Sequence, residues 1–89
     1  MNNNQLVPEI IEMFTYLKII KTDDIVALEK EITNKLEDIN FVRGLIALFS
    51  QQIELNIFDK NNRKLKHLLL ELEKIKLTLL LDQAILVKN

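Results

Sequence analysis

The last third of the chain constrains the fold most. From Arg63 to Val87 neither Pro nor Gly interrupts the sequence, and apolar residues recur three and four positions apart. That spacing predicts one long α-helix with a heptad-like row of core residues. The row consists of Leu65, Leu68, Leu72, Ile75 and Leu79. Other leucines lie outside this row, so the helix is apolar on most sides and one neighbouring helix cannot cover it.

Three shorter helices are predicted before this one, over residues 6–21, 23–39 and 41–58. Asn40 and the polar run Asp59–Asn62 are the expected breaks between helices. The chain of 89 residues contains one Gly and one Pro. We therefore expect an all-α fold, an antiparallel four-helix bundle with short connections, in a single domain over residues 1–89.

The second predicted helix has the clearest amphipathic pattern. Its expected buried residues are Leu28, Ile32 and Leu36, and its expected exposed residues are Glu29, Lys30 and Asn34. Gly44 lies inside the third predicted helix. Because an interior Gly costs a helix about 1 kcal/mol relative to Ala, we expect Gly44 to allow close packing there.

The residues needed for catalysis are scarce. The chain has no cysteine, which excludes thiolate nucleophiles and cysteine metal sites, and its single histidine is His67. Ser50, His67 and Asp59 could supply a catalytic triad by residue type, but no nucleophile-elbow glycines surround Ser50. We therefore predict a protein that is not an enzyme, with no catalytic residue, no cofactor and no metal site.

Charge is distributed unevenly along the chain. The formal net charge is −1, which gives no reason to expect a nucleic-acid partner. Acidic residues prevail in the first 40 residues and basic residues in the remainder. A basic cluster of Lys60, Arg63, Lys64 and Lys66 surrounds the start of the fourth helix. Cations are mildly unfavourable at a helix N-terminus, so we expect them to face an acidic partner or the acidic first half.

The most apolar run of the sequence, residues 77–87, contains Asp82. It is too short to span a membrane, which takes about 20 apolar residues. The chain opens Met1-Asn2-Asn3-Asn4-Gln5, without a basic segment followed by an apolar one. We therefore expect a cytoplasmic protein.

Part of this apolar run is the candidate partner-binding surface. The candidates for incomplete burial are Leu77, Leu81, Ile85, Leu86 and Val87. An exposed apolar patch on a small protein usually marks an interaction site. The alternative is that the other helices wrap the fourth helix and bury these side chains in the core.

Three segments resemble a known family. They are Gln5-Leu-Val-Pro-Glu9, the pair Asp24-Ile-Val26 and Lys35-Leu-Glu37, and Asn61-Asn-Arg-Lys-Leu-Lys66. They resemble the immunity proteins of class IIa (pediocin-like) bacteriocins, of the enterocin A immunity type. The resemblance implies a non-enzymatic protein at the inner face of the membrane, which recognises a sugar-transporter receptor locked by a bacteriocin. It also implies that the C-terminal part of the fourth helix faces the partner.

Two alternatives remain open at the level of sequence. Val7-x-Glu9-Ile-Ile11 and Asp24-Ile-Val26 are similar to segments of small phage anti-sigma proteins. That similarity implies a regulatory inhibitor or another protein-binding adaptor. A structural homodimer that covers its own leucine-rich face is the other alternative.

Overall fold

The computed structural model describes residues 5–20, 23–55 and 59–88, the last three by their backbone alone. Over these residues the fold is all-α, a bundle of four helices without strands, as predicted from the sequence. The helices are α1 (Leu6–Tyr16), α2 (Ile25–Lys35), α3 (Ile39–Leu55) and α4 (Asn62–Lys88).

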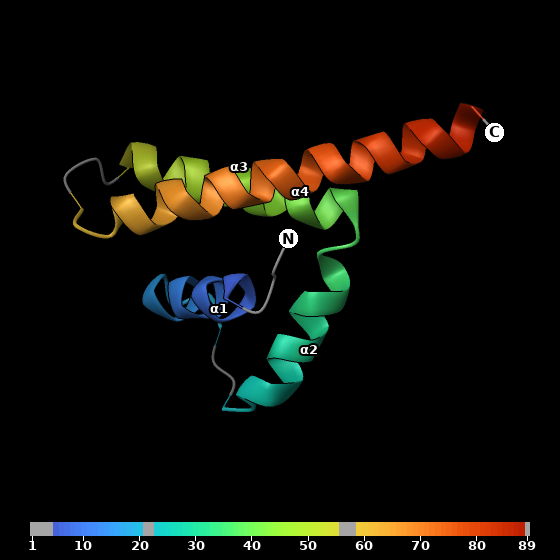
Figure 1. Ribbon diagram of the computed structural model, residues 1–89. Coiled ribbons are helices and arrows are strands. Elements are labelled where there is room, and N and C mark those ends of the chain that lie inside the picture. Colours follow the sequence, from blue (N-terminus) through green and yellow to red (C-terminus); the bar gives the residue numbers. More distant parts are fainter. Residues whose placement is uncertain (1–4, 21–22, 56–58, 89) are drawn as a thin grey trace.

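Helices α3 and α4 form an antiparallel pair, and their interface is the most extensive in the molecule (Figure 1). Helix α1 lies beneath this pair and contacts both α4 and α2. Helix α2 extends away from the pair at a steep angle, and the C-terminal end of α4 projects past α3 on the opposite side of the molecule from the α3–α4 connection. The principal extents of 45 × 30 × 20 Å reflect this elongated arrangement.

The core lies between α1, α3 and α4. Its buried α4 residues are Leu65, Leu68, Leu72 and Ile75, as the heptad-like row predicts, while Leu79 is half-buried. These α4 residues share the core with Val42, Leu45 and Phe49 of α3. From α1 the core receives Leu6, Val7, Ile10, Ile11, Met13 and Phe14. The Phe14 and Phe49 rings are tilted by 58° with centroids 6.1 Å apart, which joins α1 to α3.

Helix α1 is shorter than the sequence predicts. It ends at Tyr16 rather than Lys21 because Lys18 adopts a left-handed conformation with φ 59°. The Ile19 N–H donates to the Phe14 carbonyl at 2.9 Å, and the Lys18 N–H donates to the Thr15 carbonyl at 3.1 Å. This is a Schellman cap with lysine in the position usually taken by glycine, so residue type alone did not reveal the helix end.

The boundary between α2 and α3 also differs from the prediction, which placed it at Asn40. The Asp38 N–H donates to the Lys35 carbonyl at 2.9 Å, which tightens and ends α2. The Asp38 carboxylate then accepts from the Asn40 N–H at 2.9 Å, and the Asp38 carbonyl accepts from the Val42 N–H at 3.1 Å. Asp38 is therefore the N-cap of α3, and Asn40 lies in its first turn.

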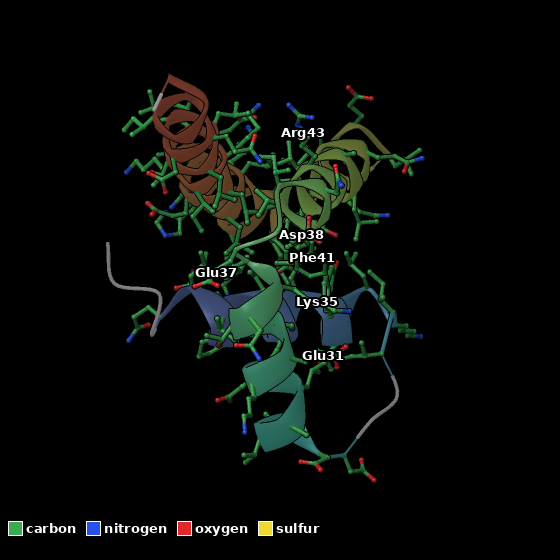
Figure 2. The ribbon with its side chains drawn as sticks, turned by 90° about the vertical axis from the view of Figure 1, so that its right-hand side faces the viewer. Glu31, Lys35, Glu37, Asp38, Phe41 and Arg43 are labelled. Atoms are coloured by element: carbon green, nitrogen blue, oxygen red, sulfur yellow. The ribbon has the colours of Figure 1, made fainter. Side chains whose placement is uncertain are left out.

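Lysine and phenylalanine side chains meet at this junction. Figure 2 shows Lys35 and Phe41 close together where α2 passes into α3. The Lys35 Nζ lies 5.6 Å from the centroid of the Phe41 ring and 3.0 Å from Glu31 Oε1. A cation over an aromatic face is attractive, so the end of α2 is fixed to the start of α3 by this side-chain contact.

The predicted face of α2 is confirmed in part. Ile32 and Leu36 are buried and Lys30 and Asn34 are exposed, whereas Leu28 and Glu29 are both half-buried. Within the bounds of α2 only Ile32 is buried. The main helix neighbour of α2 is α1, so one narrow side of α2 is covered.

Gly44 does not serve the close packing that the sequence predicted. It is exposed, and a Cβ atom placed there would meet no atom within 4 Å.

Gly44→Ala should therefore raise the free energy of unfolding by about 1 kcal/mol, the difference in helix propensity. The matched control is Ala47→Gly, one turn further along the exposed side of α3, which should lower it by about the same amount. Urea unfolding measures both, and a loss of stability in Gly44→Ala would contradict the open environment.

Candidate functional site

Helix α4 is much longer than the helix it pairs with. It has 27 residues and α3 has 17, so their lengths are about 40 Å and about 25 Å at the usual rise per residue. The C-terminal end of α3 and the N-terminal end of α4 lie at the same end of the antiparallel pair, so the C-terminal part of α4 extends past the N-terminal end of α3 (Figure 1). Burial falls accordingly: Ile75 is buried, Leu79 and Leu80 are half-buried, and residues 81–85 are all exposed. We call residues 81–88 the α4 extension.

Large apolar side chains lie on the outward side of α4. Leu70, Leu77, Leu81 and Ile85 are each between 56% and 63% exposed. Their spacing of seven, four and four residues places them on one side of the helix, opposite the buried row. We call these four residues the outer stripe. The predicted incomplete burial is confirmed for Leu77, Leu81 and Ile85, whereas the side chains of Leu86 and Val87 lie outside the described residues.

Leu70 is a member of this stripe that sequence reasoning missed. It precedes Leu77 by seven residues, so a second heptad-like row beside the buried one would have indicated it.

The residues of the basic cluster at the start of α4 differ in whether they have an acidic neighbour. Lys64 Nζ lies 2.9 Å from Glu12 Oε1 of α1, so this lysine faces the acidic first half of the chain. Arg63 and Lys66 are exposed, and neither forms an ion pair with any other residue that the structure describes. The first turn of α4 contains no acidic residue that could offset them.

An open groove separates α1 from the start of α4. It has a volume of about 520 Å³, with Met13 and Leu68 among its apolar lining residues. Its rim carries the Lys64–Glu12 pair and His67, whose Nε2 lies 3.9 Å from Glu9 Oε2. The side chains of both pairs are largely exposed. The groove therefore presents cations and carboxylates that already face each other across two helices.

The residue types of a catalytic triad have other neighbours in the fold. The Asp59 carboxylate accepts hydrogen bonds from the Tyr16 hydroxyl and, at 2.7 Å, from the Asn61 N–H. His67 instead faces Glu9. Asp59 therefore ties the start of α4 to the end of α1.

These two hydrogen bonds stabilise the ionised carboxylate and lower the pKa of Asp59 below its ordinary value of 3.8. The bond from Tyr16 is the larger cause and the bond from Asn61 the second.

Tyr16→Phe should move the pKa of Asp59 back toward 3.8 because it removes the stronger of the two donors. The stabilising contribution of Asp59 is present above its unfolded pKa and is lost as pH falls through its folded pKa. The variant should therefore lose less stability than the original chain on acidification below pH 3.8. An NMR titration of the Asp59 carboxyl carbon measures this shift, and an unchanged pKa in Tyr16→Phe would contradict the assigned cause.

The described residues form neither a membrane-spanning helix nor a metal-binding group. No helix there is long and apolar enough to cross a membrane. No group of three or more His, Cys, Asp or Glu side chains is placed to hold a metal ion.

No protein-family model, no curated protein and no solved structure matches this chain. The likeness to bacteriocin immunity proteins therefore rests on the sequence segments given above.

Proposed function

We propose that this chain is a non-catalytic binding protein and that the outer stripe of α4 binds a helical segment of another protein. The observation that carries the proposal is the exposure of Leu70, Leu77, Leu81 and Ile85 on one side of a projecting helix. Leu77, Leu81 and Ile85 follow one another at successive turns, and an exposed apolar patch on a small protein usually marks an interaction site.

The shape of the stripe favours a helix as the partner. The stripe is a single row on a convex surface, whereas the groove lies between α1 and α4. Rows of apolar residues at three- and four-residue spacing are complementary to a second helix with the same spacing. Flat or concave partners would leave part of such a row in water.

The apolar contact alone gives weak binding. Burying the exposed parts of four Leu and Ile side chains contributes about 4–7 kcal/mol. Association itself costs about 4–15 kcal/mol in lost translational and rotational freedom. Tight binding therefore needs further contacts beside the stripe.

Leu81→Glu should leave the fold intact, because the Leu81 side chain is 63% exposed. Its melting temperature should stay close to that of the original chain. Leu72→Glu should unfold the protein instead, since Leu72 is fully buried and an unpaired charge in the core is strongly destabilising. Thermal unfolding followed by circular dichroism measures both. Unfolding of Leu81→Glu would show that the stripe belongs to the core.

The more specific form of the proposal comes from the resemblance to class IIa bacteriocin immunity proteins. In that form the partner is a membrane sugar-transporter receptor with bound bacteriocin, and the α4 extension meets the complex at the inner face of the membrane.

Expression of the chain in a strain sensitive to class IIa bacteriocins tests this form. The chain should raise the concentration of bacteriocin needed to stop growth, and Leu81→Glu should abolish the protection. Gln83→Glu is the matched control, because it adds the same charge to an exposed position of the extension away from the stripe. Absence of protection by the folded chain against a panel of these bacteriocins would reject the immunity function.

A further inference from the structure

We infer that the helix bound by α4 is acidic and amphipathic, with carboxylates over Arg63 and Lys66 and apolar residues over the outer stripe. This inference rests on the proposed function and names the chemistry of the partner.

The basic and apolar residues form one continuous face. Arg63 and Lys66 precede Leu70 by seven and four residues, so they lie on the same side of α4 as the outer stripe, with Arg63 at the edge that also borders the groove. The face from residue 63 to residue 85 is about 33 Å long. It is basic at the N-terminal end of the helix and apolar at the projecting end, so a partner helix lying along it meets both kinds of surface.

Two cations of this face, Arg63 and Lys66, lack counter-charges within the described part of the chain. Lys64 pairs with Glu12, Lys74 with Glu71 and Lys76 with Glu73. In contrast, Arg63 and Lys66 have no such carboxylate, and they stand at the positive end of the helix dipole. Carboxylates of a partner would relieve this repulsion and would add the contacts that the stripe alone lacks.

A second copy of this chain is a poor complement. Parallel pairing of two α4 helices places Arg63 and Lys66 over the same cations of the other copy. Antiparallel pairing along the whole face, centred on Lys74, places Arg63 over Ile85, Lys66 level with Asp82 and Lys74 over its own counterpart. Asp82 lies about 100° around α4 from Leu81, off the shared face, and neither arrangement supplies a carboxylate to Arg63.

An anionic membrane surface is also a poor complement. A helix that lies in a membrane interface presents a broad apolar face. Here the outer stripe is a single row flanked by acidic Glu71, Glu73 and Asp82. Glu71 and Glu73 are paired with Lys74 and Lys76, and these charged pairs stay in water beside a narrow partner helix but would have to enter a membrane interface beside the stripe.

The test uses two labelled synthetic peptides of about 22 residues, long enough to cover the face. Both are helical and carry Leu or Ile at heptad spacing; one has Glu and the other Lys at the flanking positions. Fluorescence anisotropy at low and high salt should show binding of the acidic peptide only, weakened by salt. Equal binding of both peptides would overturn the inferred charge of the partner.

The double variant Arg63→Glu, Lys66→Glu sharpens the test. It should bind the acidic peptide at least about tenfold more weakly, or about 1.4 kcal/mol, and should gain affinity for the basic peptide. The control Lys18→Glu, Lys30→Glu makes the same change of net charge at exposed positions outside α4 and should bind as the original chain does. Unchanged binding by the double variant would overturn the inference.

Failure of this inference and failure of the proposed function give different results. If Leu81→Glu abolishes binding while charge reversal does not, the stripe binds a helix of another charge and only the inference is wrong. If Leu81→Glu has no effect on either peptide, the proposed binding face is wrong. Binding to phosphatidylglycerol vesicles that depends on the stripe would overturn the inference and identify a membrane surface as the partner. A stripe-dependent dimer in sedimentation equilibrium would likewise overturn it and identify a second copy of the chain as the partner.

Discussion

The packing of α4 against α3 is the interaction on which the rest of the structure depends. The buried leucine row of α4 meets Val42, Leu45 and Phe49 of α3, and α1 closes the third side of the core through its own apolar face. The Phe14–Phe49 contact, the Lys64–Glu12 pair and the Tyr16–Asp59 hydrogen bond hold α1 in place. Helix α2 adds Ile32 and, at its C-cap, Leu36.

The unequal lengths of α3 and α4 convert this packing into a candidate binding surface. Wherever α3 accompanies α4, one side of α4 is buried and only its outward side meets water. Toward its C-terminus α4 extends past the N-terminal end of α3, and residues 81–85 are exposed. Extending α3 would cover the end of the helix, whereas the outer stripe would still face outward. The outer stripe thus depends on the second apolar row, whereas the α4 extension depends on α3 being the shorter helix.

Sequence periodicity predicted the helices and the core row well, because a core position requires an apolar residue at regular spacing. It predicted the helix ends less well. Lys18 ends α1 in a left-handed conformation that lysine rarely adopts, and Asp38 caps α3 although Asn40 is an equally competent capping residue. A glycine inside a helix looks the same in the sequence whether its surroundings are tightly packed or empty, and the surroundings of Gly44 are empty. Exposure of the outer stripe followed from the position of α3 and α1, which periodicity does not determine.

Native-state hydrogen exchange along α4 tests the central claim most directly. Amides of the packed part of α4 exchange only through large-scale unfolding, whereas amides of an unaccompanied helix end exchange by local fraying. We predict strong protection through residue 79 and a sharp fall in protection beyond residue 81 in the isolated protein. Uniform protection to residue 85 would show that the extension is packed, and would contradict its assignment as an unaccompanied helix end.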